Sequence, residues 1–170
     1  MEVQENNLTK LCSFYISDWH LVTMLLPYIS KKVNERVEIA TILEKNIKDN
    51  VETLVEKLNL KNDEGILSID WNSKSKKDNY NLEKIIKNSK KEKVIIVNGN
   101  KEFIEDVNIH IEKYIKNIDE LNIKIVNCYE ITQYDGSINE ILDSHDKVLN
   151  TSGEKEIYEV FEDYKKKKIS

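Results

Sequence analysis

The sequence predicts an α/β protein, built as a three-layer α/β/α sandwich around a five-stranded, mainly parallel sheet. Two observations point to this class. Short apolar runs rich in Ile and Val alternate with segments whose apolar residues recur every three or four positions. Several of the runs are continuous rather than alternating, which is typical of strands buried on both faces. This alternation of strand and helix indicates βαβ units and a parallel sheet.

Five apolar runs are predicted to be strands. They are Leu11–Ile16, Val37–Leu43, Ile66–Ile69, Val94–Val97 and Ile123–Val126. Their spacing of roughly 25 to 30 residues is the size of one βαβ step. Such a sheet is Rossmann-like or flavodoxin-like, with helices on both of its faces.

Six segments between and after these runs are predicted to be helices: Leu21–Val33, Ile47–Leu58, Asn79–Lys90, Phe103–Ile118, Ile138–Leu149 and Glu154–Lys166. Pro27 lies inside the first of them, so that helix is predicted to be either kinked or split near Leu26. The last segment is predicted to be an extra C-terminal helix. Its apolar residues are expected to pack either on the domain's own sheet or on another protein, which is a partner or a second copy of the chain. Those residues are Ile157, Val160, Phe161 and Tyr164.

Length and composition indicate one domain over residues 1–170, with a polar N-terminal arm at 1–10 and a C-terminal helix and basic tail at 151–170. With 39% hydrophobic residues the chain can form a core without disulfide bonds. Cys12 and Cys128 lie in apolar runs and are predicted to be buried free thiols.

The charge balance argues against a dedicated nucleic-acid binder, because the formal net charge is −5. No apolar segment at the N-terminus resembles a signal peptide, and no apolar run approaches the roughly 20 residues of a membrane span. A cytoplasmic location is therefore expected.

Arg36 is the only arginine, and Lys, Asn and Ile are abundant. This bias indicates an AT-rich genome, bacterial or from a phage.

The candidate ligand-binding residues follow from the expected sheet, since ligands bind beyond the carboxyl ends of parallel strands. They are Ser17, Asp18, His20, Lys45, Asp70, Asn72, Asn98 and Asn100. The same residue types also cap helices, and Asp18 and either Asn98 or Asn100 are predicted N-caps. The polar segment Asn72–Asn79 is either a solvated loop or a flap over the strand ends.

Motifs for catalysis and cofactors are absent from the sequence. There is no GxGxxG or GxxxxGK[ST] loop to hold phosphates and no GxSxG nucleophile elbow. His110 and His145 fall among apolar residues of predicted helices and are read as ordinary helix residues. The prediction is accordingly that the protein has no cofactor, no metal and no catalytic residue.

The segments ISDWH and VNGNKE resemble motifs of the calcineurin-like metallophosphoesterases. The resemblance implies that Asp18, His20, Asp70 and Asn98 or Asn100 hold two metal ions. This chain departs from the family at Lys101, where the family has its catalytic histidine, and the later metal-binding histidines are missing.

The order of elements also resembles that of response-regulator receiver domains, with Asp18 and Asp70 at the matching strand ends. That resemblance implies a phosphoacceptor role for Asp70. This chain has Asn98 where receivers have Ser or Thr, and Asn127 or Cys128 where they have Lys.

The favoured function is a non-catalytic regulatory or protein-interaction module that binds a small polar or anionic ligand at the strand ends. The reason is that the strand ends are polar, while no set of residues specific to a reaction is complete. A divergent metal-dependent phosphoesterase using Asp18, His20 and Asp70, or a degenerate receiver-like domain, is the alternative.

Overall fold

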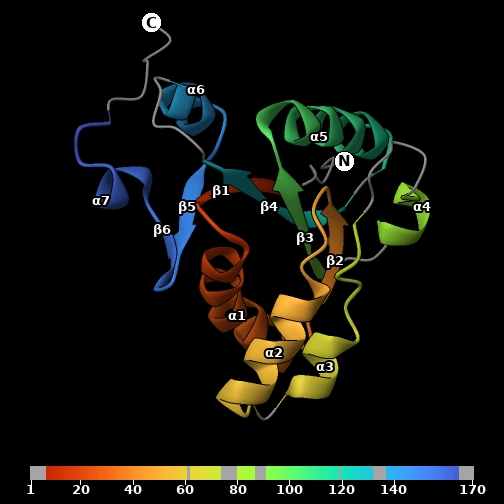
Figure 1. Ribbon diagram of the computed structural model, residues 1–170. Helices are drawn as coiled ribbons and strands as arrows, with labels where there is room; N and C mark the ends of the chain where they lie inside the picture. Colours follow the sequence, from red (N-terminus) through yellow and green to blue (C-terminus); the bar gives the residue numbers. More distant parts are fainter. Residues whose placement is uncertain are drawn as a thin grey trace, which may run out of the picture.

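Six strands form one sheet in the order β2-β3-β4-β1-β5-β6 (Figure 1). The computed structural model describes residues 7–60, 62–73, 80–86, 91–118, 120–131 and 137–164. The strands are β1 (Asn7–Tyr15), β2 (Glu38–Leu43), β3 (Glu92–Gly99), β4 (Asn122–Glu130), β5 (Lys147–Asn150) and β6 (Gly153–Lys155). The first five run parallel, and β6 pairs antiparallel with β5. The predicted class is confirmed, with one strand more than expected.

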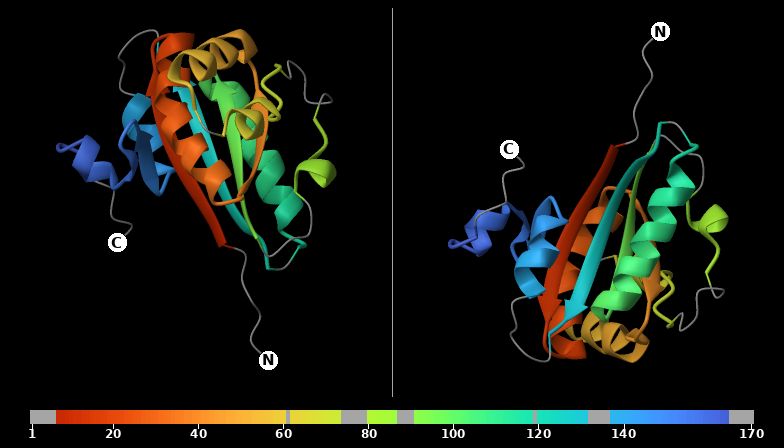
Figure 2. Two further views of the ribbon diagram at one scale, coloured as in Figure 1. Left: turned by 90° about the horizontal axis from the view of Figure 1, so that it is seen from below. Right: turned by 90° about the horizontal axis from the view of Figure 1, so that it is seen from above.

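Helices cover both faces of this sheet. Those of the described chain are α1 (Asp18–Asn34), α2 (Lys48–Leu58), α3 (Asp63–Leu67), α4 (Leu82–Ile85), α5 (Lys101–Ile115), α6 (Ser137–Asp143) and α7 (Ile157–Val160). The two views of Figure 2 show α1 and α2 over one face and α5 and α6 over the other. Side chains of α3 pack with those of α1, whereas those of α4 pack on the face that α5 covers.

The buried residues of β3 show how the sheet divides the core in two. Val94 and Ile96 pack with α1 and α2, while Ile95 and Val97 pack with α5 and α6. All four are 0% exposed. Successive strand residues point to opposite faces, so a continuous apolar run is what a strand between two helical layers requires.

The prediction of a strand at Ile66–Ile69 is wrong, because this run ends the short helix α3 and then turns. Ile66 is fully buried. Gly65 lies so close to α1 that a Cβ added there would come within 2.5 Å of Val33 Cγ1. A short apolar run buried on one side fits a helix turn as well as a strand, which periodicity alone cannot separate. The chain then continues along the outer edge of β2, where Ser73 forms an isolated parallel bridge with Leu43.

The predicted helices at Ile138–Leu149 and Glu154–Lys166 are also wrong in extent. Helix α6 ends at Asp143, and residues 147–150 form β5 beside β1. The chain then turns into β6 and the four-residue helix α7. Residues 147–150 hydrogen-bond to the edge of β1, which would otherwise leave its backbone N–H and C=O groups unpaired. This pairing outweighs the weak helix propensity of so short a segment.

The remaining helices match their predictions closely. Helix α1 runs unbroken through Pro27, so a split near Leu26 is excluded. Strand β1 begins at Asn7, which shortens the polar arm expected over 1–10. The helix expected over Asn79–Lys90 is represented by α4 within the described residues 80–86. Most of the Asn72–Asn79 loop and the basic run Lys165–Lys168 lie outside the described residues.

Candidate functional site

The carboxyl ends of β1 and β4 lie side by side at a point where the chain leaves the sheet in opposite directions. After β1 the chain enters α1 on one face, and after β4 it enters α6 on the other. Such a point opens a crevice in α/β sheets and is where ligands bind. The backbone N–H of Ile131 donates to Tyr15 O at 2.9 Å and holds the two ends together.

Tyr15 is the last residue of β1, and its ring packs in the core on the α1 face of the sheet. The residue is 0% exposed. Its hydroxyl has no hydrogen-bond partner among the residues that the structure describes. Burying a hydroxyl without a partner costs about 1–3 kcal/mol, so the position favours a bound group that supplies one.

Burial raises the pKa of the Tyr15 hydroxyl well above its ordinary value of 10, and the neighbouring Cys128 thiol raises it further. Three nearby carboxylates add to the same rise: Glu130, Asp18 and Glu44. The hydroxyl therefore stays protonated at neutral pH, and it can both donate and accept a hydrogen bond.

An ion pair spans the rim of the sheet above these residues. Lys45, from the end of β2, reaches across the end of β3 and pairs with Glu130 at the end of β4. Both side chains remain partly exposed, at 40% and 25%. Exposed pairs of this kind are worth about 0–1 kcal/mol, so a ligand can open this one at little cost.

Asn98 stabilises the loop that carries Lys45 rather than facing a ligand. Its Oδ1 accepts from the N–H groups of Glu44 at 2.9 Å and Lys45 at 3.2 Å, and its Nδ2 donates to Lys45 O at 3.3 Å. Asn98 is 0% exposed. All of its side-chain polar atoms are thus used to join the ends of β2 and β3.

The other predicted residues of β1 and β3 mainly cap helices. Ser17, not Asp18, is the N-cap of α1, because its Oγ accepts from the N–H of His20 at 3.1 Å. His20 in turn accepts from the N–H of Ile16 through Nδ1 at 3.1 Å. Asn100 caps α5 by accepting from the N–H of Phe103, as predicted.

Asp70 lies apart from this rim. It belongs to the segment outside β2, where its carboxylate accepts from the backbone and side-chain N–H groups of Asn72. Four strand-to-strand steps separate that segment from β1, which corresponds to about 19 Å. Asp18 and His20 therefore do not meet Asp70. Within the described ranges, no three His, Cys, Asp or Glu side chains are grouped so that they could hold a metal ion.

The candidate site is thus smaller than the sequence indicates. The structure brings Lys45 and Asp18 together with three residues that the predicted set did not include, namely Tyr15, Glu44 and Glu130. Glu44 and Glu130 end their strands in the sequence and could have been found by that position. The importance of Tyr15 could not, since an unpartnered hydroxyl is visible only after packing.

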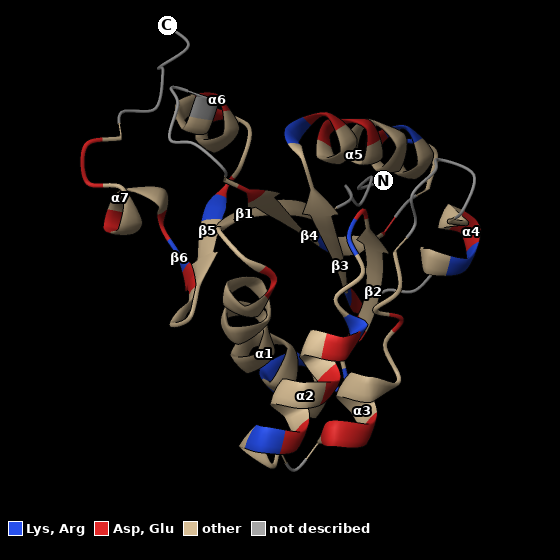
Figure 3. Ribbon diagram, viewed as in Figure 1, with Lys and Arg blue, Asp and Glu red and all other residues tan. Residues whose placement is uncertain are grey.

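Both cysteines are buried free thiols, as predicted. Burial raises the pKa of Cys12 to about 12, which removes the thiolate needed for reactivity. Acidic and basic residues intermix along α2, α4 and α5 (Figure 3), as on an ordinary solvated surface. Of the helices that the structure describes, none combines the length and the apolar character needed to cross a membrane.

No protein-family model matches the chain, and the comparisons with curated proteins and with solved structures find no significant match. The functional argument therefore depends on the geometry of the strand ends.

Proposed function

We propose that this protein is a non-catalytic regulatory module that binds a small polar ligand at the crevice between β1 and β4. The observation that carries the proposal is the buried Tyr15 hydroxyl, which lacks a partner in the described part of the chain. Tyr15 ends β1 at the edge of the sheet where ligands bind in α/β proteins, and it lies near Glu130, whose partly exposed ion pair with Lys45 is weak.

The charges around the crevice favour a zwitterionic ligand over the purely anionic one that the sequence also left open. A ligand that opens the Lys45–Glu130 pair leaves one cation and one carboxylate to be matched. A free amino acid matches both, with its carboxylate toward Lys45 and its ammonium toward Glu130. A simple anion would be repelled by Asp18 and Glu44 close by.

The test is thermal unfolding of the protein with free amino acids at millimolar concentration, with phosphate and citrate as the anionic probes. A ligand at roughly ten times its Kd adds about 1.4 kcal/mol to the free energy of unfolding and raises Tm by about 4 °C. The expected result is such a rise with at least one amino acid and none with the two anions.

Tyr15→Phe is the decisive variant. Removing an unpaired buried hydroxyl should raise the free energy of unfolding of the free protein by about 1 kcal/mol and abolish the response to the ligand. Tyr28→Phe is the matched control, because the Tyr28 hydroxyl already donates to Glu154 Oε2 at 3.0 Å. That control should lose stability and keep the response. No response to any amino acid, or an unchanged response in Tyr15→Phe, would overturn the proposal.

A further inference from the structure

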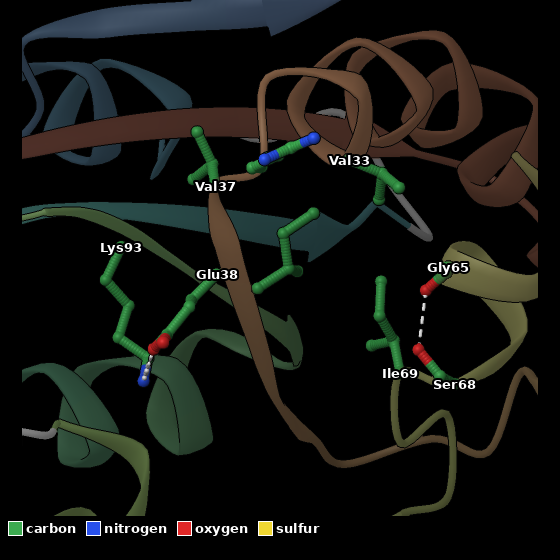
Figure 4. Close-up of a pocket in the computed structure, with 9 residues that line it drawn as sticks. Val33, Val37, Glu38, Gly65, Ser68, Ile69 and Lys93 are labelled. Carbon is green, nitrogen blue, oxygen red and sulfur yellow. Dashed lines mark hydrogen bonds and ion pairs between the residues drawn. The ribbon is translucent and has the colours of Figure 1, made fainter.

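A cavity of about 360 Å³ lies between α1, α3 and the first residues of β2. Glu38 and Lys93 line it, so it is at the end of the sheet where β2 and β3 begin, away from the crevice at the carboxyl ends of the strands. Figure 4 shows Val33 and Val37 on one side of the cavity and Ile69 on the other. Small-molecule sites span about 300–1,000 Å³, so the cavity suits a small organic ligand.

The walls of this cavity are mainly apolar. Four partly buried apolar side chains from α1, from β2 and from the segments beside them line it: Val33, Val37, Ile39 and Ile69. All four also pack against the core on the α1 face of the sheet. Covering the apolar surface that they still expose is favourable, so the ligand that fits has an apolar body.

The charged residues of the lining leave one cation unbalanced. Lys93 pairs with Glu38 at 3.0 Å, and the Lys93 side chain is only 11% exposed. The third charged residue of the lining is Arg36, whose guanidinium forms no hydrogen bond or ion pair with a residue that the structure describes. The lining therefore carries one excess positive charge, although the net charge of the whole chain is −5.

Arg36 also has a backbone conformation that is strained for its residue type. Its N–H donates to Val33 O and the N–H of Val37 donates to Lys32 O, both at 3.0 Å, which is the Schellman motif at the end of α1. This motif needs a left-handed residue, usually glycine, and the φ of Arg36 is +62°. Strained positions of this kind are often functional, and here the strained residue is the only arginine of the chain.

We infer that this cavity binds a small monocarboxylic acid with an apolar body. The guanidinium of Arg36 holds its donors in a planar fork, which matches a carboxylate through two parallel hydrogen bonds. The four apolar side chains of the lining cover the body of the ligand. The site is separate from the crevice between β1 and β4, and the inference does not depend on ligand binding there.

Other small ions fit this lining less well. Phosphate and citrate carry more negative charge than Arg36 alone can balance, and they would leave the apolar walls uncovered. A free amino acid would bring its ammonium group close to the cations Arg36 and Lys93. A neutral molecule would leave the guanidinium without its partner.

The test is a titration of the full chain with phenylacetate, observed by amide NMR, with phenylacetamide as the matched neutral probe. A Kd of roughly 1 mM is expected for an acid of this size. The amide signals of Ile39, Gly65 and Ile69 should shift, because these residues line the cavity. Phenylacetamide should bind at least tenfold more weakly. Tyr15→Phe should bind phenylacetate as the unmodified chain does, since Tyr15 belongs to the crevice.

Arg36→Gly separates the strain at this position from its use. Glycine adopts a positive φ without strain, so the variant should raise Tm of the free protein by about 2–4 °C. It should also weaken phenylacetate binding at least tenfold. Arg36→Lys keeps the charge without the planar fork, so it should weaken binding by about threefold. Asn59→Gly is the matched control, since Asn59 ends α2 at a φ of +48° and is not among the lining residues. That control should bind phenylacetate with unchanged affinity.

Four outcomes contradict the inference. One is the absence of phenylacetate binding, and another is equal affinity for phenylacetate and phenylacetamide. A third is unchanged affinity in Arg36→Gly, which would mean that the guanidinium does not hold the carboxylate. The last is a set of shifts confined to the carboxyl ends of the strands, because the acid would then bind at the crevice instead.

Discussion

At the scale of single residues, most polar side chains at the strand ends form hydrogen bonds within the fold, and few are left to bind a ligand. The side chains of Asn98, Asn100 and Ser17 accept hydrogen bonds from backbone N–H groups of a loop and of two helix starts. Tyr15 is the exception, with a buried hydroxyl that no described residue satisfies. Candidate residues chosen for being polar at a strand end are therefore more often structural, since the same loops must satisfy their own backbone groups.

Gly99 shows how closely the rim is packed. Its φ is +147°, and an added Cβ would come within 2.7 Å of Glu44 Oε1 and 2.8 Å of Glu44 Cβ. Glu44 Oε1 also accepts from the N–H of Asn100 at 2.9 Å. The missing side chain of Gly99 thus makes room for the carboxylate that links the ends of β2 and β3.

Gly99→Ala should lower the free energy of unfolding by about 2–4 kcal/mol, from backbone strain and from the displaced Glu44. Gly153→Ala is the matched control. Its φ is also positive, at +104°, but an added Cβ meets nothing within 4 Å, so the loss should be about 1 kcal/mol. Urea denaturation measures both. Equal losses in the two variants would show that contact with Glu44 contributes nothing.

At the scale of elements, the hairpin of β5 and β6 is attached to the sheet and to α1 by a connected set of polar side chains. Glu154 of β6 accepts from Tyr28 Oη at 3.0 Å and from Lys124 Nζ at 2.8 Å. Lys124 and Lys32 both pair with Glu92 at 3.2 Å. Burial alone would raise the pKa of Glu154, but the hydrogen bond and charge of Lys124 outweigh it and lower the pKa.

Glu154→Gln should loosen this hairpin and lower the free energy of unfolding by about 1–2 kcal/mol. Because the pKa of Glu154 is lowered by folding, its contribution is present above the ordinary carboxyl pKa and is lost as pH falls below it. Hydrogen exchange of β5 and β6 should accelerate in the variant at neutral pH. Glu159→Gln, on the exposed side of α7, should leave exchange unchanged. Equal exchange in both variants would contradict the role of Glu154.

The C-terminal elements also show which surface covers the last apolar residues. Ile157 is buried, Phe161 packs edge-on against Phe14, and the Tyr164 hydroxyl bonds to Asp143. The domain itself therefore covers most of this stripe, which is one of the two alternatives that the sequence left open. A partner bound through the last helix stays a prediction, and Tyr158 and Val160, at 64% and 36% exposed, are apolar residues of that helix available to it.

At the scale of the whole molecule, a buried polar cluster joins both chain halves on the α5 face. His145 donates through Nδ1 to Ile141 O at 2.6 Å, and its Nε2 accepts from Asn127 Nδ2 at 2.9 Å. Asn127 and Asn108 exchange two further hydrogen bonds of 2.9 Å. The cluster connects β4, α5 and the turn before β5, and it requires a neutral imidazole.

This cluster makes the stability of the protein depend on pH. Burial lowers the pKa of His145 to about 4; the bond to Ile141 O opposes this, Lys10 adds to it, and Asp146 opposes it. The unfolded chain binds the proton near pH 6.5. The stabilisation is therefore complete above about pH 6.5 and is lost as pH falls toward 4, by about 3 kcal/mol.

Denaturant titrations between pH 7 and pH 4 measure this dependence. His145→Gln keeps a donor and an acceptor but cannot titrate, so the part of the slope due to this residue should vanish in that variant. A wild-type slope in His145→Gln would show that other groups cause the acid sensitivity.

The sequence by itself determined the class of fold, because continuous Ile- and Val-rich runs between amphipathic helices have few other ways to bury their apolar surface. It also determined α1, α2 and α5, whose apolar residues recur at helical spacing over enough turns to be recognised from the sequence alone.

Tertiary contacts decided the short elements. The segment around Ile66 forms the helix α3, which packs against Val33 of α1, and residues 147–150 form a strand beside β1. Local propensity is weak over four or five residues, and the partner that completes their hydrogen bonds or packing is distant in the sequence. The same reason applies to the site, since Tyr15, Lys45 and Glu130 come together only through the order of the strands.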